Sequence, residues 1–250
     1  MDCYIRPSRS SKGQSQAKKM LLELLKNTPV PDDELLENLG LYIRSVYLAK
    51  ILYCNELYLR ILNIPGIVVE LGFWRGANLA LFEAFRSVYE PYNLTRKVVG
   101  FDTLKGYPSI SPQDRDSTYV AVGGYAVGEE YENYLTSVLD IHERDNYAPH
   151  IKKHEIVKGD VLKTIDQYLS RNPETIIALA YFDLAMYEPT KKCLEAIKPH
   201  LVRGSVLAMD ELNSHDFPGE TLAFREVFGL DRYKMYRSGY LPDRSYVIIE

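Results

Sequence analysis

The chain has 250 residues, of which 46% are hydrophobic and 26% charged, and these fractions are typical of a globular protein. A net charge of −4 and a pI near 5.8 disfavour broad binding to nucleic acid or to an anionic membrane. Three scattered cysteines exclude a disulfide framework, and no apolar run reaches the roughly 18 residues of a membrane span. We therefore expect a cytoplasmic protein that binds neither nucleic acid nor a membrane.

Residues 1–64 are predicted to form a helical N-terminal extension. The N-terminus lacks the apolar core of a signal peptide, and the basic stretch Arg6–Lys19 is expected to be a disordered tail. The segments "AKKMLLELLKN" and "LYIRSVYLAKILYCNELYLRIL" repeat apolar residues at helical spacing. The apolar stripes in Met20–Leu25 and Leu41–Leu62 exceed what one helical layer needs, which predicts a homo-oligomer.

Residues 65–250 are predicted to form one α/β domain. Short β-rich runs alternate with helical patterns, which favours a mostly parallel sheet with helices on both faces. After the last helical pattern, "YKMYRS" and "RSYVIIE" predict an antiparallel hairpin, giving seven strands. The predicted strands before it are Ile67–Leu71, Lys97–Asp102, His154–Lys158, Thr175–Asp183 and Gly204–Asp210; the predicted helices are Ala77–Tyr89, Glu129–Arg144, Val161–Arg171, Glu188–Lys198 and Glu220–Phe228.

The turn "ELGFWRG" follows the first predicted strand and suggests a ligand site. A dinucleotide site wants G-x-G-x-x-G, but Trp74 takes the place of the second glycine, and a P-loop lysine is absent. Glu70 would repel a phosphate, whereas it suits a cationic amine. Glu70, Gly72 and Gly76 therefore favour S-adenosylmethionine, which carries an ammonium and no phosphate.

Two further acids end the next strands. Asp102 is placed to accept hydrogen bonds from ribose hydroxyls, and Asp160 to receive the adenine amino group. Asn78 and Thr103, beside these positions, complete the predicted donor site. The alternative is that each acid only caps the helix that follows it.

A second set of acids, Asp183, Asp210 and Glu211, follows the fourth and fifth predicted strands. Three clustered carboxylates fit a hard divalent cation such as Mg²⁺, which would orient a hydroxyl and lower its pKa. Helix capping is again the alternative. His215 lies just beyond and is a candidate base for the hydroxyl proton.

The segment Thr103–Gly128 is too long for an ordinary connection and is predicted to be a lid over the site. Tyrosines in it and in the following helix suit stacking on a sugar ring, although tyrosine also packs in cores. These residues are Tyr107, Tyr119, Tyr125, Tyr131 and Tyr134.

Five motifs in order resemble those of the macrocin-type sugar O-methyltransferases, from about Val68 to Pro218. They are "ELGFWRGAN", "GFDTLKGYP", "GDVLKTI", "YFDLAMYEPT" and "MDELN". The resemblance implies a class I methyltransferase (Rossmann-like) fold, oligomerisation through the N-terminal helices and Mg²⁺-dependent methyl transfer. The sequence departs from the family where Ala185 replaces an acid, and where Glu211 replaces an aspartate.

We therefore expect an S-adenosylmethionine-dependent O-methyltransferase that modifies a sugar hydroxyl of a glycosylated natural product or glycan. Asp183 and His215 are the predicted catalytic residues. Two alternatives remain open: a catechol-type acceptor, which also chelates Mg²⁺, and a non-catalytic donor-binding module.

Overall fold

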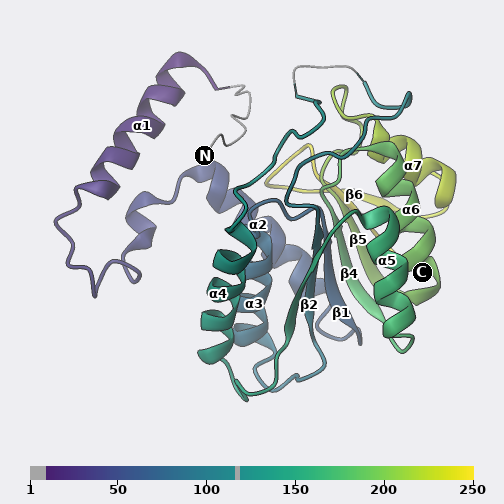
Figure 1. Cartoon of the computed structure of the whole chain (residues 1–250), viewed down its shortest axis with the longest axis horizontal. Helices are drawn as coiled ribbons and strands as arrows, with labels where there is room; N and C mark the ends of the chain where they lie inside the picture. Colours follow the sequence, from purple (N-terminus) through teal and green to yellow (C-terminus); the bar gives the residue numbers. More distant parts are fainter. Residues whose placement is uncertain (1–9, 116–118) are drawn as a thin grey trace.

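The computed structural model describes residues 10–115 and 119–250, which form a seven-stranded sheet with helices on both faces (Figure 1). The strand order is β3-β2-β1-β4-β5-β7-β6. Strands β1 to β5 run parallel, and β7 pairs antiparallel with both β5 and β6. The predicted mostly parallel sheet with a C-terminal antiparallel hairpin is confirmed. The strands are β1 (Ile67–Leu71), β2 (Val98–Asp102), β3 (His154–Lys158), β4 (Ile177–Phe182), β5 (Leu201–Met209), β6 (Met235–Arg237) and β7 (Ser245–Ile248).

Side chains alternate between two apolar clusters, one on each face of the sheet. Val68, Tyr181 and Ala208 belong to the cluster beneath α2, α3 and α4. Val69, Phe182 and Met209 belong to the cluster beneath α5, α6 and α7. The helices are α1 (Lys12–Lys26), α2 (Ser45–Arg60), α3 (Ala77–Tyr89), α4 (Tyr131–Arg144), α5 (Val161–Arg171), α6 (Tyr187–Ile197) and α7 (Gly219–Val227), with short 3-10 turns η1 (Leu39–Tyr42) and η2 (Lys198–His200).

The predicted element boundaries agree with the structure to within a few residues. Strand β4 begins later than predicted, because Thr175 closes a turn on the carbonyl oxygen of Asn172. Strand β5 begins earlier, at Leu201, and tolerates an irregular register opposite the start of β4. These shifts leave every predicted acid at the carboxyl edge of the sheet.

One prediction about the N-terminal part is wrong. Residues Lys12–Lys19 of the expected disordered tail belong to α1, and the tail's first residues lie outside the described part of the chain. A reciprocal capping box starts this helix: the side chains of Ser11 and Gln14 each bond the other's backbone N–H. Composition suggested disorder, but this local cap favours a helix.

The helix α1 and the segment up to η1 form an arm that projects away from the sheet (Figure 1). No residue of α1 or η1 is buried. In contrast, α2 packs directly on the sheet, and its Tyr53, Cys54, Leu57 and Tyr58 are fully buried. No helix of the described residues is long and apolar enough to cross a membrane.

Candidate active site

The turn after β1 contains two glycines, and at the first of them the backbone lies against the segment that follows β4. Gly72 has a φ of +82°, and a Cβ on it would lie 2.3 Å from the carbonyl oxygen of Asp183. Gly76, with a φ of +72°, precedes α3, and a Cβ there would lie 2.6 Å from the side chain of Leu135. Both positions therefore require glycine, for its left-handed backbone and for close packing.

The backbone N–H of Trp74, in the turn after β1, forms a hydrogen bond with the side chain of Asp102. Its N–H donates to Oδ2 of Asp102 at 2.7 Å, and the N–H of Leu104 donates to Oδ1 at 2.7 Å. Burial raises the pKa of Asp102, and these backbone hydrogen bonds oppose the rise. Asp102 thus connects the β1 turn to the start of the lid, and its contact with a ribose hydroxyl stays a prediction.

Glu70 is the most informative residue of the predicted donor site. It is 1% exposed; its Oε1 accepts from Asn78 at 2.7 Å, whereas its Oε2 is buried without a partner. Burial raises the pKa of Glu70 to about 8, with the charge of Asp183 adding to the effect and Lys50 opposing it. A buried acceptor without a partner costs free energy unless a ligand supplies a donor. This oxygen therefore fits the ammonium of S-adenosylmethionine.

The other two predicted donor contacts have local structural roles. Asp160 caps α5 by accepting from the N–H of Leu162 at 3.0 Å. Thr103 donates its hydroxyl to the carbonyl oxygen of Gly106 at 2.7 Å, inside the turn that begins the lid. Helix capping accounts for one oxygen of Asp160, and its assignment to adenine stays a prediction.

The acids after β4 and β5 differ sharply in their partners. Asp210 is buried; Tyr181 donates to its Oδ1 and Arg244 to its Oδ2, each at 2.6 Å. Among residues 10–115 and 119–250, no cation forms an ion pair with the carboxylate of Glu211. Burial raises the pKa of Glu211 to about 8, and the charges of Asp210 and Asp183 add to this rise. The charges of Asp210 and Asp183 therefore disfavour the ionised form of the Glu211 carboxyl group.

A divalent cation fits this part of the site, although the three acids are not tightly grouped. Among the described residues, they do not form a set of ligand atoms all within 4.8 Å of one another. The charges of Asp183 and Asp210 both act on Glu211, and a set of carboxylate oxygens at one edge of the sheet suits a hard cation. Both oxygens of Asp210 already accept a hydrogen bond, one from Tyr181 and one from Arg244, so Asp210 has fewer lone pairs left to bind a metal ion. The residues that would hold Mg²⁺ are thus Asp183 and Glu211, with Asp210 as a weaker third ligand.

Sequence reasoning missed Glu220, which holds the two acidic loops together. It is fully buried in α7; its Oε1 accepts from the N–H of Ala185 at 3.2 Å and its Oε2 from the N–H of Glu211 at 2.9 Å. Burial raises its pKa well above the ordinary value, and the charge of Glu211 adds to this. The signal was present, since an acid within the apolar face of a predicted helix needs a partner.

The lid packs on the site through aromatic side chains. Tyr107 and Tyr125 have ring centroids 5.4 Å apart, and Tyr125 meets Trp74 edge-on at 5.8 Å. Asp114 of the lid also accepts from the N–H of Tyr187, at the first turn of α6, at 2.8 Å. The lid is therefore attached to both the donor turn and the loop after β4.

The departure at Ala185 has a structural reason. Ala185 is 4% exposed and lies in a small apolar cluster with Met186, Phe217 and Val120, the last of which comes from the lid. An aspartate at this position would put a charge into apolar contacts without a cation. In this chain Ala185 packs in the same apolar cluster as Val120 of the lid and so helps to keep the lid in place.

His215 is not enclosed with the acids. Its side chain is 79% exposed, and its ring nitrogens lie near the guanidinium of Arg115 and, at 3.6 Å, a carboxylate oxygen of Asp216. His215 and Glu211 do line one open hollow of about 680 Å³ between the β5–α7 loop and the β6–β7 hairpin. Of the three predicted metal-binding acids, Glu211 is the one that lines this hollow.

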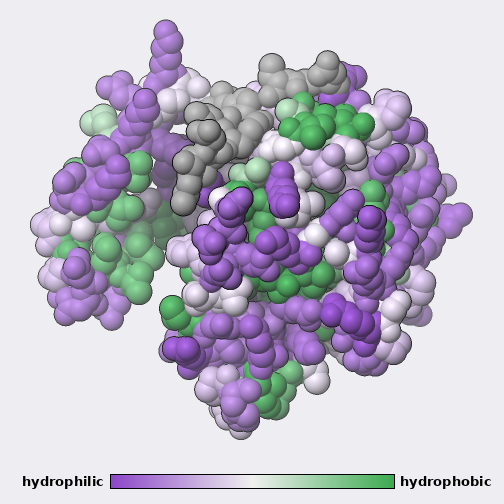
Figure 2. All heavy atoms as spheres, in the orientation of Figure 1, coloured by the Kyte–Doolittle hydropathy of each residue, from purple (hydrophilic) through white to green (hydrophobic). Residues whose placement is uncertain are grey.

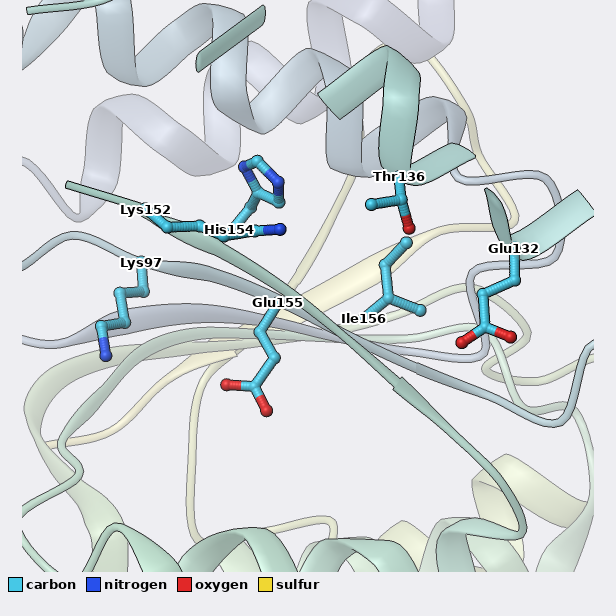
Figure 3. A pocket seen from close by; sticks show the side chains of 7 residues that line it. All are labelled: Lys97, Glu132, Thr136, Lys152, His154, Glu155 and Ile156. Carbon is cyan, nitrogen blue, oxygen red and sulfur yellow. The ribbon is translucent and has the colours of Figure 1, made fainter. Parts of the chain in front are cut away.

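A second hollow of about 400 Å³ lies away from these residues, at the free edge of β3 (Figure 3). His154 and Glu155 belong to the first half of β3 and point to opposite faces of the sheet (Figure 3). Because the predicted site residues follow the carboxyl ends of the strands, this hollow is not part of the candidate active site.

The open sheet with its glycine turn, the buried Glu70 and the acids at its carboxyl edge define the class I S-adenosylmethionine-dependent O-methyltransferases. The sequence matches the macrocin O-methyltransferase family over residues 58–232, so the chain belongs to this family. No curated protein matches the chain.

Solved structures agree with this assignment. The chain is similar to the calicheamicin methyltransferase CalS11, with 41% identity, a TM-score of 0.94, and 96% and 94% of the two chains covered. An apo structure of CalS11, described as a TDP-rhamnose 3′-O-methyltransferase, gives 39% identity, a TM-score of 0.86 and 96% of each chain. The O-methyltransferase NovP shares the fold, at 16% identity, a TM-score of 0.62, and 94% and 98% coverage. The predicted S-adenosylmethionine-dependent sugar O-methyltransferase is confirmed.

Proposed function

We propose that this enzyme methylates a hydroxyl of a nucleotide-linked deoxysugar, with S-adenosylmethionine as donor. Identity to CalS11, a TDP-rhamnose 3′-O-methyltransferase, reaches 39–41% and extends over nearly the whole chain. The observation that carries the donor half is the unpartnered Oε2 of Glu70 beside the Gly72 turn. The hollow beside Glu211 and His215 supports the acceptor half.

The proposed chemistry is mainly alignment. When bound, the donor supplies an electrophilic methyl group, and the protein's task is to hold a sugar oxygen in line with it. Glu70, Asn78 and Asp102 hold the donor on one side. The aromatic side chains of the lid, Tyr107 and Tyr125 among them, exclude water above it.

We propose Mg²⁺ as a second cofactor, held by Asp183 and Glu211 with Asp210 as the weaker ligand. Such an ion polarises a hydroxyl and fixes its orientation when bound. Asp183 is then the proposed acceptor of the hydroxyl proton. His215 is the second candidate, because it lines the hollow beside Glu211.

We also propose a homo-oligomer that resides in the cytoplasm and binds neither nucleic acid nor membrane. Large apolar side chains of the arm are exposed, among them Met20, Leu24, Leu36 and Leu41, at 61 to 78%. Figure 2 shows hydrophobic side chains gathered on this arm. A second copy of the chain is the occupant that fits them.

Calorimetry tests the donor half. S-adenosylhomocysteine should bind with a Kd of micromolar or tighter, which is about −8 kcal/mol, and NAD and ATP should not bind. If NAD or ATP binds and S-adenosylhomocysteine does not, the donor assignment is wrong.

Turnover tests the acceptor half, with TDP-rhamnose compared against a catechol at equal concentrations. Methylation of the sugar nucleotide alone supports the proposal. Methylation of the catechol alone identifies a catechol-type enzyme. Tight donor binding with no turnover of either acceptor, or of a finished glycoside, indicates a non-catalytic donor-binding module.

A further inference from the structure

Helix α2, which precedes the β-sheet in the chain, places a lysine over the carboxyl edge of that sheet. The inner face of α2 carries Tyr53 and Cys54: the Tyr53 ring lies 6.2 Å from that of Tyr181, and Cys54 Sγ lies 3.8 Å from Oδ1 of Asn78. Lys50 is half-buried, one turn nearer the helix N-terminus on this face. Since helical side chains lean towards the N-terminus, Lys50 extends past Asn78 and Tyr181.

The acids of the site project towards the same helix. Glu70 follows the alternation of Val68, which belongs to the α2-side cluster. Asp183 and Asp210 continue the alternation of Tyr181 and Ala208, because their backbone N–H groups still bond the neighbouring strands, to Leu71 and Phe182 respectively. Burial lowers the pKa of Lys50, but the charges of Asp183, Asp210 and Glu70 outweigh it and raise the pKa overall. Lys50 is therefore a charged ammonium among these carboxylates.

The charges on this face are only partly paired. Arg244 neutralises Asp210. In the described chain, the ammonium of Lys50 has neither a hydrogen bond nor an ion pair within 4.0 Å, and Oε2 of Glu70 has no partner. The site thus presents one uncommitted cation and one uncommitted carboxylate oxygen on a single face.

This pair is complementary to an amino-acid zwitterion. We propose that Lys50 binds the α-carboxylate of the donor's methionine end while Glu70 binds its α-ammonium. The inference rests on the proposed donor, and it adds a residue of the predicted extension to the donor site. Without Lys50, the acids at this edge would attract the ammonium and repel the carboxylate beside it. The competing explanation is that Lys50 serves only as a counter-charge for Asp183 and Asp210.

Calorimetry with three ligands tests the assignment. S-adenosylhomocysteine carries both charged groups, S-adenosyl-3-thiopropylamine lacks only the carboxylate, and 5′-methylthioadenosine lacks both. Wild-type protein should bind the first about tenfold or more tightly than the second. The variant Lys50→Met should bind these two with Kd values within about threefold of each other, because the group that senses the carboxylate is gone.

Two further variants serve as controls. Glu70→Gln should weaken binding of both ammonium-bearing ligands and preserve the preference for the carboxylate. Lys97→Met, an exposed lysine lining the hollow of Figure 3, should behave as wild type. Thermal melting of each variant checks that it is folded.

Three results would overturn the inference, and each has a different meaning. If Lys50→Met still prefers the carboxylate tenfold, another group binds it. If this variant loses affinity for all three ligands equally, Lys50 is a counter-charge only. If wild-type protein binds none of the three, the proposed donor itself fails.

Discussion

Arg244 donates from Nη2 to Oδ2 of Asp210 at 2.6 Å, so the C-terminal hairpin supplies a cation to the acids at the edge of the sheet. Arg244 lies immediately before β7, which pairs with β5, the strand that ends at Met209 just before Asp210. The antiparallel hairpin therefore does more than complete the sheet. It also supplies the positive charge that pairs with Asp210.

The first prediction is that Arg244→Met destabilises the ligand-free protein. Removing one partner of a buried ion pair leaves an uncompensated charge and costs about 3–5 kcal/mol, and here the side chains are 16% and 3% exposed. Urea unfolding should show this loss. Added Mg²⁺ should stabilise the variant more than wild type, because Asp210 becomes available as a ligand.

The matched control is Arg171→Met, whose ion pair with Glu155 is long and exposed. Its unfolding free energy should change by less than about 1 kcal/mol. Equal effects of the two substitutions would show that the Asp210 pair has no special role.

The second prediction concerns the pH dependence of stability. The pKa of Glu70 is about 8 in the folded protein and near 4.5 in a model peptide. Between these values the folded state binds more protons than the unfolded state, so the contribution of Glu70 to stability falls as pH rises. Above the folded pKa this contribution is lost and changes no further. Glu211, with a pKa also near 8, acts in the same direction.

Glu70→Gln should therefore be more stable than wild type at pH 9 and should lose less stability between pH 7 and 9. Chemical unfolding of the ligand-free proteins at several pH values measures this. Glu90 and Glu143 have lowered pKa values and titrate below the window. Parallel curves for variant and wild type would contradict a raised pKa at Glu70.

The strand-end acids could be predicted from the sequence because the carboxyl ends of parallel strands meet at one edge. That rule placed Glu70, Asp102 and Asp183 correctly. It could not assign partners, since the residues that neutralise or hold the acids are distant in the chain. Lys50, Glu220 and Arg244 come from three other elements, and only the sheet brings them to the acids.

Local signals in the sequence were sometimes stronger than composition. The serine–glutamine cap of α1 predicts a helix start, yet the basic composition around it suggested disorder. Lys50 stands between apolar residues in "LAKIL", on a helix whose buried face it extends. A charged residue at such a position indicates a charged partner, and that signal could have found it.

The third prediction concerns the metal. Glu211→Gln keeps the backbone N–H bond to Glu220 but removes the ligand charge. The Mg²⁺ concentration for half-maximal turnover should rise about tenfold or more, and Asp183→Asn should lower turnover by about 10²-fold or more. The Kd of S-adenosylhomocysteine should change little, because the donor contacts lie mainly on β1 and β2.

EDTA should abolish turnover of wild-type enzyme and Mg²⁺ should restore it. Glu174→Gln, at an exposed acid preceding β4, is the control and should need no more Mg²⁺ than wild type. If the EDTA-treated enzyme keeps full turnover, Asp183 and Glu211 do not form a metal site. The hydroxyl proton would then pass to a protein base, with His215 the next residue to substitute.

The fourth prediction is that the exposed arm holds the oligomer together. Met20 and Leu24 are one turn apart on α1 and are 61% and 63% exposed. Light scattering at high micromolar concentration should give wild type at least twice the chain mass of 28.7 kDa. The double variant Met20→Glu/Leu24→Glu should shift towards the chain mass, because burying two carboxylates in an apolar interface is unfavourable. Leu230→Glu, at an exposed leucine after α7, should leave the mass unchanged. A wild-type chain that stays monomeric would show that these apolar side chains serve another purpose.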